Sequence, residues 1–253
     1  MKIAKFTNSP LTEVVCGVEF TAPDFSAVHF GLYWQTIRDR FPVLPQDLPP
    51  IGDIDVLPIM PKLRRVWFES ADKQQLIQLQ ANRFHYNWRR QNELDKYPHF
   101  EEIYPKFEEE WRNFQNWWLE LGGLPLQATR YELTYLNQID QVFGWNNPED
   151  TSKIFTFVGK EWNGFLDKPK LNSSELEFIL PNNLGTFGVS LNQRRRIEDD
   201  SFLMFFELTS RSADTNSKIN DWFDAAHEYT VKAFLDLIQE DIKQEWGFQC
   251  LTQ

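Results

Sequence analysis

Residues 82–90 read NRFHYNWRR, and they decide the expected fold because aromatic and polar side chains alternate along them. Successive side chains of a β-strand point to opposite faces, so a strand here would have one aromatic and one polar face. We expect the aromatic face to pack in the core and the polar face to point away from it. The aromatic set is Phe84, Tyr86 and Trp88, and the polar set is Arg83, His85, Asn87 and Arg89.

The flanking segments extend this strand into a meander that is followed by a helix. The segments RRVWFES (64–70) and QQLIQLQ (74–80) precede it, with connections short enough for tight turns. Large apolar residues then recur at steps of three or four along residues 97–121, which is typical of an amphipathic helix. Gly122 and Gly123 follow at the position of a helix C-cap. The apolar positions are Phe100, Ile103, Phe107, Trp111, Phe114, Trp118 and Leu121.

The order of elements is expected to occur twice. The first half has a strand (11–20), a helix (24–41), the meander and the aromatic helix. In the second half we expect a strand at 127–139, a helix at 148–166, three further strands and a last helix from about Ser217 to Trp246. Corresponding elements are offset by roughly 110 to 118 residues, which indicates an internal duplication. The three further strands are expected at 173–181, 185–193 and 201–211.

The predicted fold is a two-layer α+β protein made of two β-α-β-β-β-α units with antiparallel sheets. Helices would cover one sheet face and leave an open polar face, in a saddle-like arrangement. We expect a single compact unit over residues 1–253, with pseudo-repeat halves 1–123 and 124–253. The topology resembles that of the TATA-binding proteins, an analogy that carries no function. Swollen ferredoxin-like halves and a helix-grip domain are alternatives. Six prolines in residues 42–63 predict an ordered but irregular arm.

The candidate binding site is the sheet face formed by the polar side chains of the predicted strands. If this face is functional, its arginines and an exposed Trp67 could bind a polar partner; otherwise it is a solvated sheet face with cross-strand ion pairs. The candidate binding residues are Trp67, Arg83, His85, Asn87, Arg89, Arg130 and Glu132. The same alternation also places on this face Arg65, Glu69, Gln78, Gln80, Thr134, Glu175, Glu177, Ser190, Asn192, Phe205, Glu207 and Thr209.

A second candidate is the run NQRRRIEDD (192–200). Arg194, Arg195 and Arg196 could bind a phosphate or a carboxylate, because each guanidinium offers a bidentate fork. The acidic residues Glu198, Asp199 and Asp200 follow at once and could instead neutralise the arginines.

Composition and motifs exclude several classes. The net charge of −11 opposes general binding to nucleic acid, which needs clustered Lys and Arg. The chain begins with no apolar leader and has no membrane-length apolar run, so a cytoplasmic protein without membrane contact is expected. Cys16 and Cys250 are expected to be buried thiols. The four histidines lack metal-ligand spacing and no nucleotide-binding glycine motif occurs, so we expect no cofactor, no metal and no catalytic residue.

Four segments resemble a sporadically distributed family of uncharacterised prokaryotic proteins of about this length. They are NSPLTEVVCGVEF, LQANRFHYNWRR, YPHFEEIYPKFEEEW and INDWFDAAHEYTVKAFLDLIQEDIKQEWG. A fourth family motif departs here, because Thr134 stands where the family has Arg, although Tyr135 and Asn137 are kept. The resemblance implies a prokaryotic cytoplasmic module, and the sporadic distribution implies a defence or toxin–antitoxin locus. The matching motifs are N-W-R at Asn87, Trp88 and Arg89, Y-P-x-[FY]-E at Tyr97, Pro98, Phe100 and Glu101, and A-H-E at Ala226, His227 and Glu228.

The function favoured by these observations is non-catalytic. Excess acid and abundant aromatic residues point to a regulatory protein that recognises a protein partner and neutralises a basic effector. A homo-oligomer is compatible with the same features. One alternative is a metal-assisted hydrolase or nuclease that uses Glu132, Glu175 and Glu177. The other is a sensor of a small anionic ligand that uses the arginine clusters.

Overall fold

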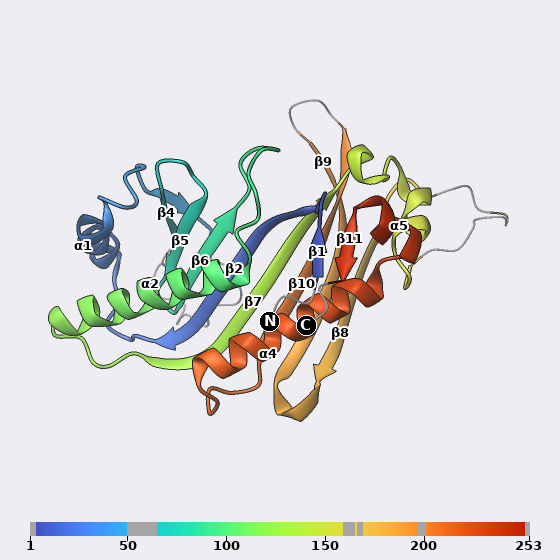
Figure 1. The fold of residues 1–253 in the computed structure, drawn as a ribbon. Helices are drawn as coiled ribbons and strands as arrows, with labels where there is room; N and C mark the ends of the chain where they lie inside the picture. The colour runs from blue at the N-terminus through green and yellow to red at the C-terminus, as the bar shows by residue number, and fades with distance from the viewer. Residues whose placement is uncertain (1–3, 50–64, 159–164, 166–168, 197–200, 251–253) are drawn as a thin grey trace. The chain divides into compact units, whose positions relative to one another are not determined.

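The computed structural model describes residues 4–49, 65–158, 165, 169–196 and 201–250. Within them lie five α-helices and eleven strands paired in antiparallel sheets, which confirms the α+β class (Figure 1). The chain divides into two compact units. The N-terminal unit is Glu13–Glu132 with Asp214–Ser217, and the C-terminal unit is Met1–Thr12, Leu133–Ala213 and Lys218–Gln253. The boundaries thus fall within two strands, whereas the expected halves divide at residue 123.

The sheet of the N-terminal unit contains the predicted meander. Its strands are hydrogen-bonded in the order β3-β4-β5-β6-β2, followed by the first residues of β7 (Gln127–Ile139), so the first long strand pairs with the last strand of the meander. The register aligns Val66 with Leu79, Leu79 with Phe84 and Phe84 with Val18, which forms a continuous apolar row across four strands. The strand bounds are β2 (Leu11–Thr21), β3 (Gln46–Leu48), β4 (Arg65–Glu69), β5 (Gln75–Gln80) and β6 (Arg83–Arg89).

Two helices, α1 (Ala27–Ile37) and α2 (Phe100–Glu120), pack on the apolar face of this sheet. Phe114 of α2 is fully buried, and its ring lies 5.3 Å from Phe84 of β6 and 5.1 Å from Tyr33 of α1. Figure 1 shows α2 lying across the strands of the meander. The aromatic helix is therefore confirmed, and Gly122 ends it with φ +86°, a conformation that glycine adopts without strain. Leu121 differs from the prediction because it is exposed.

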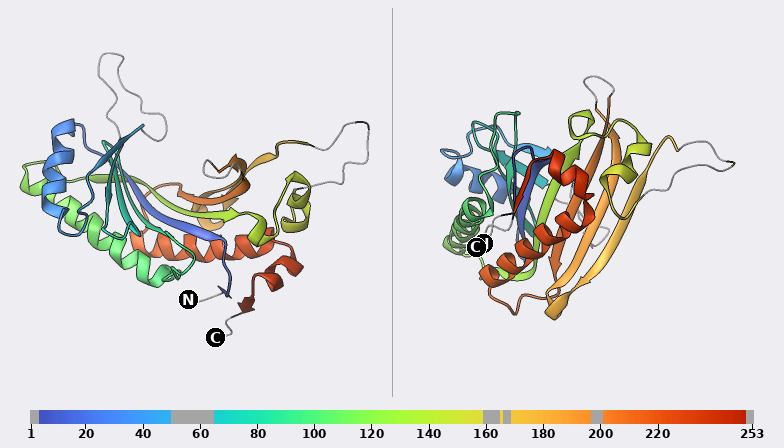
Figure 2. Two further views of the ribbon diagram at one scale, coloured as in Figure 1. Left: turned by 90° about the horizontal axis from the view of Figure 1, so that it is seen from above. Right: turned by 45° about the vertical axis from the view of Figure 1, so that its right-hand side comes forward.

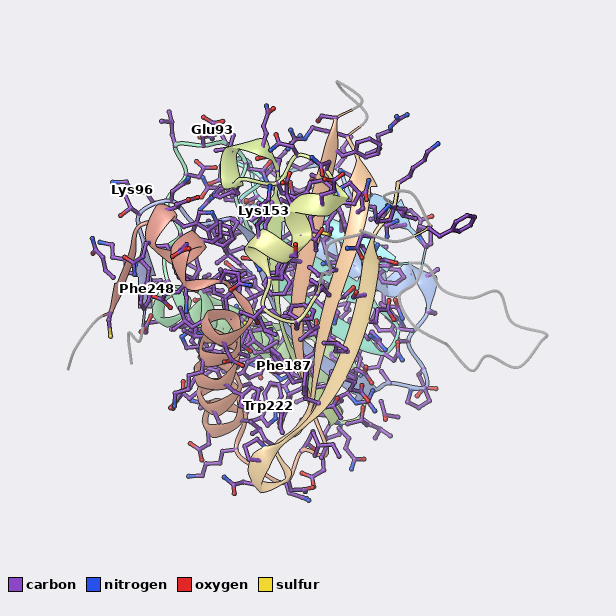
Figure 3. All side chains as sticks on the ribbon, turned by 90° about the vertical axis from the view of Figure 1, so that its right-hand side faces the viewer. Glu93, Lys96, Lys153, Phe187, Trp222 and Phe248 are labelled. Atoms are coloured by element: carbon purple, nitrogen blue, oxygen red, sulfur yellow. The ribbon has the colours of Figure 1, made fainter. Side chains whose placement is uncertain are left out.

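The sheet of the C-terminal unit has the strand order β7-β10-β9-β8. Helix α4 (Ile219–Leu237) packs on its apolar face, where Phe187 lies 5.3 Å from Tyr229 and Trp222 donates a hydrogen bond to the carbonyl of Leu184. Figure 3 shows Phe187 and Trp222 together on this helix-covered side. The strand bounds are β7 (Gln127–Ile139), β8 (Ser173–Leu180), β9 (Gly185–Arg195) and β10 (Phe202–Ser212), and a separate two-stranded sheet pairs β1 (Ala4–Phe6) with β11 (Phe248–Cys250).

Two predicted helices are shorter than expected. In the segment expected to be a helix at 148–166, the α-helix α3 (Thr151–Ile154) ends at Phe155, because Phe155 adopts an extended conformation and bridges to Ile238; residues 159–164 and 166 lie outside the described residues. The last helix is interrupted at the same place: Ile238 is extended, and α5 (Glu240–Glu245) begins after it. Phe155 and Ile238 are both buried, so tertiary packing overrides local helix propensity here. Short 3₁₀ turns occur at Gln141–Phe143, Pro148–Asp150 and Pro181–Asn183.

The order strand, helix, three strands, helix is present in both halves of the chain. In both sheets the first strand of this series also pairs with the last, as β2 does with β6 and β7 with β10. The short α3 contrasts with the eleven-residue α1. Descent of the two halves from one ancestor stays a prediction. Of the proline-rich arm, residues 50–64 lie outside the described residues.

Candidate functional site

The candidate site is the polar face of the N-terminal unit's sheet, opposite the face on which α1 and α2 pack. His85 and Asn87 lie at its centre with only 4% and 0% of their surface exposed. The expected open face is therefore not open at its centre, because the polar and the aromatic side chains of β6 are both buried there. The polar face comprises Glu13, Gly17 and Glu19 on β2, Arg65, Trp67 and Glu69 on β4, Gln78 and Gln80 on β5, Arg83, His85, Asn87 and Arg89 on β6, and Arg130 and Glu132 on β7.

Strand register brings these residues together in rows. His85 is paired with Gly17 on one side and with Gln78 on the other, and Gln78 is paired with Trp67. The neighbouring row pairs Arg83 with Glu19 and with Gln80. Directly opposed residues of an antiparallel pair have Cβ atoms about 4.5–5.5 Å apart, so side chains in a row are in reach of one another. The pairing thus gathers residues that are far apart in the sequence.

Cross-strand ion pairs, one of the two interpretations of this face, are confirmed. Arg83 Nη2 lies 2.8 Å from Glu19 Oε1, and Arg130 Nη1 lies 3.7 Å from the same oxygen. Arg89 pairs with Glu69, whose other carboxylate oxygen accepts a hydrogen bond from Gln46 Nε2 at 3.1 Å. Arg83 and Arg89 keep 17% and 16% of their side chains exposed, so part of each guanidinium reaches solvent.

Trp67 is held between two arginines. The guanidinium carbons of Arg65 and Arg89 lie 5.5 Å and 5.3 Å from the centre of its ring, within cation–π range. Its indole Nε1 donates to Gln78 Oε1 at 3.0 Å, and Arg65 Nη1 donates to the same oxygen at 2.9 Å. The tryptophan is only half-buried. Its ring thus contacts two positively charged groups on the polar face.

His85 has a tightly enclosed ring. A Cβ atom added at Gly17 would lie 2.6 Å from His85 Cδ2 and 2.9 Å from Nε2, so the ring covers the space that a side chain at residue 17 would fill. Nε2 lies 3.9 Å from Glu132 Oε1, beyond hydrogen-bond distance. Burial lowers the pKa of His85 below its ordinary value, and the negative charge of Glu132 opposes this shift. The imidazole is therefore neutral at neutral pH.

Arg65 differs from the other arginines of the polar face. Among the residues that the structure describes, no carboxylate lies within ion-pair distance of its guanidinium, which has Trp67 and Gln78 as neighbours. Partial burial lowers the pKa of Arg65, and the charge of Glu13 acts more weakly in the opposite direction. Removing a charge from water costs free energy unless a partner compensates. Arg65 is thus a partly desolvated cation that makes no ion pair with any described residue, although the charge of Glu13 acts on it from a greater distance.

Several buried polar atoms of the face make no hydrogen bond within the described part of the chain. Such atoms are rare in native structures, and each one costs on the order of 1–3 kcal/mol unless water, an ion or a ligand satisfies it. Five such atoms lie on one sheet face, where water, an ion or a ligand would satisfy them. The atoms are Nε of Arg65, Arg83 and Arg89, Nε2 of His85 and Oδ1 of Asn87.

Three members of the site were absent from the sequence-based list. Glu13 accepts a hydrogen bond from Asn87, Glu19 pairs with Arg83, and Gly17 gives the ring of His85 its space. All three have the same parity in the strand at 11–20, opposite to Val14, Cys16 and Val18. The alternation could therefore have found them once this strand was known to pair with residues 83–89.

The arginine run of the C-terminal unit does not form one anion site within the described residues. Arg196 lies 2.9 Å from Asp140, and Arg195 lies over the ring of Phe202 at 5.0 Å. Arg194 and Arg195 are adjacent on β9, so their side chains leave opposite faces of the sheet. The proposed neutralising residues Glu198, Asp199 and Asp200 lie outside the described residues.

The carboxylates of the metal-dependent alternative are not gathered. Glu132 is buried in the N-terminal unit, whereas Glu175 and Glu177 are exposed on β8 of the C-terminal unit. Across the described ranges, no three His, Cys, Asp or Glu side chains group as metal ligands would. His227 Nδ1 is hydrogen-bonded with the hydroxyl of Tyr135 at 2.8 Å, a structural contact between α4 and β7. Cys16 is buried as expected, but Cys250 is exposed.

Comparisons of the chain with known proteins add no information on this site. No family model, no curated protein and no solved structure matches the chain. The resemblance to a prokaryotic family therefore stays a prediction. No helix among the described residues is both long enough and apolar enough to cross a membrane.

Proposed function

We propose that the N-terminal unit binds a small ligand that carries a carboxylate, and that Arg65 is the residue that receives this group. The observation that carries the proposal is the partly buried guanidinium of Arg65, which has Trp67 and Gln78 beside it and no carboxylate within reach among the described residues. An anion in this position would supply the missing counterion. A guanidinium binds a carboxylate through parallel hydrogen bonds, which gives direction as well as affinity.

The neighbouring groups define what else the ligand must offer. The Nε donors of Arg83 and Arg89 call for further acceptor oxygens, and Oδ1 of Asn87 calls for one donor. A carboxylate that also carries a hydroxyl or amino group meets both requirements, whereas a dicarboxylate supplies only the acceptor oxygens. Burial of the centre of the face favours a ligand of this size over a protein surface, which would need a broad exposed area.

The polar face has no grouping that supports chemistry on the ligand. His85 is the one titratable base at its centre, and it is enclosed by Gly17 and neutral. We therefore assign the site to binding, as in a sensor or a ligand-dependent regulator. A sensor of a small anionic ligand is one of the alternatives that the arginine clusters of the sequence predict.

Thermal unfolding of the full chain with added anions tests the proposal. A ligand that binds only the folded state raises the free energy of unfolding by RT ln(1 + [L]/Kd), and the unfolding midpoint rises with it. We expect succinate to raise the midpoint relative to sodium chloride at equal ionic strength, and Arg65→Gln to abolish the rise relative to its own unliganded midpoint. Arg112→Gln, at an exposed position of α2, serves as the matched control and should keep the rise. Equal rises in both variants, or no rise in the unchanged chain, would contradict the proposal.

A further inference from the structure

The C-terminal unit ends in a strand whose outer edge is unpaired within the described residues. β8 is the last strand of the order β7-β10-β9-β8, and it pairs only with β9 (Figure 2). Its eight residues pair with β9 without interruption from Ser173 to Leu180. Proteins usually protect such an edge with lysine, proline, a bulge or a covering element, because its free N–H and C=O groups can pair with another chain. β8 contains no lysine, proline or bulge.

The two faces of β8 differ in chemistry. Leu176 and Phe178 continue the buried row formed by Val189 and Phe187 of β9, yet they remain 39% and 42% exposed, and no strand of the described residues pairs beyond β8. On the opposite face, Glu175 and Glu177 are exposed and have no basic partner in the part of the chain that the structure describes. The edge therefore offers apolar area on one face, and on the other face two negative charges followed by the exposed Ile179.

A second copy of this chain fits the edge poorly. Two β8 strands could pair in antiparallel fashion with their apolar residues on the same face. In the registers that overlap most of the strand, this pairing places glutamates opposite each other. In one such register Glu177 faces the same residue of the other copy, and in the next Glu175 faces Glu177. Like charges directly opposite each other destabilise a sheet. The charge pattern thus selects against self-pairing and in favour of a basic strand.

We propose that β8 is a docking edge for an extended segment of another protein in which basic and apolar residues alternate. The segment would add a strand to the sheet, with main-chain hydrogen bonds to β8 for affinity. Its apolar side chains would cover Leu176 and Phe178, and its Lys or Arg side chains would lie beside Glu175 and Glu177. This site is independent of the anion site on the N-terminal unit.

A labelled nine-residue peptide of alternating Lys and Val tests the docking edge by fluorescence anisotropy with the full chain. We expect saturable binding, and a loss of about tenfold or more in affinity in the variant Glu175→Lys/Glu177→Lys, since two favourable cross-strand pairs become repulsive. The variant Glu109→Lys/Glu120→Lys on α2 carries the same change in net charge at exposed positions and should bind as the unchanged chain does. A peptide of alternating Glu and Val should not bind.

Two further measurements separate strand addition from general attraction. Methylation of alternate backbone nitrogens removes the peptide's ladder donors and should abolish binding if the segment pairs with β8. Equal binding of the methylated peptide, equal weakening in both charge variants, or absence of binding to the unchanged chain would overturn the proposal. Sedimentation that shows a dimer dissociated by Glu175→Lys/Glu177→Lys would also overturn it, because β8 would then be occupied by a second copy.

Discussion

The two faces of the N-terminal unit's sheet both have buried residues at their centre, but different interactions stabilise them. On the helix side, Phe84 packs on Trp111 and Phe114 of α2, and the surroundings are rings. On the polar face, His85 and Asn87 of the same strand are equally buried among ion pairs and hydrogen bonds. Five buried polar atoms on the polar face make no hydrogen bond among the described residues, whereas among the buried polar side-chain atoms of α1 and α2 only the hydroxyl of Tyr33 makes none. The difference separates the face that stabilises the unit from the face that we propose binds a ligand.

The largest expected effect comes from the apolar face. Phe114→Ala removes a fully buried ring that contacts Phe20, Phe84 and Tyr33, and we expect it to lower the free energy of unfolding by about 3–5 kcal/mol. Leu119→Ala on the same helix alters a side chain that is 46% exposed and should change stability little. Urea denaturation of both variants checks this. Comparable losses in the two would show that α2 is not held by its ring face.

A smaller loss is expected when an ion pair of the polar face is broken. Glu69→Ala removes the carboxylate that pairs with Arg89. We expect the free energy of unfolding to fall by about 2–3 kcal/mol because a mostly buried cation loses its partner. Glu228→Ala removes the partner of Lys232 from an exposed pair on α4 and should have little effect. Denaturation midpoints at equal pH compare the two. If Glu69→Ala is as mild as Glu228→Ala, the polar face contributes nothing to stability.

The contact between Gly17 and His85 gives a third prediction. Gly17→Ala places a methyl group against a ring that is enclosed on the polar face, so we expect a loss of about 1–3 kcal/mol. In a His85→Ala background the space is free, and the same change at residue 17 should cost much less. A double-mutant cycle measures this coupling. Additive effects of the two substitutions would show that the His85 ring does not contact residue 17.

The smallest expected effect is a pH dependence. The pKa of His85 in the folded chain lies below its ordinary value of 6.5, so the unfolded chain takes up the proton first as pH falls. The stabilisation by the neutral ring is therefore complete above pH 6.5 and decreases as pH falls toward the folded pKa. We expect the stability of His85→Gln to decline less than that of the unchanged chain between pH 6.5 and about pH 5. Parallel pH profiles would rule out this role.

Much of the N-terminal unit's fold could be predicted from local pattern. The alternation in residues 82–90 and the ring spacing of residues 100–118 gave the strand, the meander and the helix because each period matches one kind of element. The break at Ile238 could not be predicted, since it depends on a bridge to Phe155, which is distant in the sequence. Local periodicity carries no information on such a contact.

The sequence predicts which residues share the polar face, but it does not predict how buried they are or which charges they contact. Alternation assigned Trp67, Arg83, His85 and Arg89 to one face, and their contacts confirm it. The burial of His85 and Asn87 could not be foreseen, because alternation assigns a side chain to a face but carries no information on what covers that face. The special position of Arg65 likewise appears only when the carboxylates around the other arginines are located.

Nuclear magnetic resonance of the arginine side chains tests the central claim most directly. Titration of the ¹⁵N-labelled chain with succinate should shift the Nε–Hε resonance of Arg65 in a saturable manner, because a bound carboxylate changes the hydrogen bonding of this guanidinium. The resonance of Arg112, at an exposed position on α2, should stay in place under the same conditions. A resonance of Arg65 that does not move, or that moves no more than that of Arg112, would contradict the assignment of the polar face as an anion-binding site.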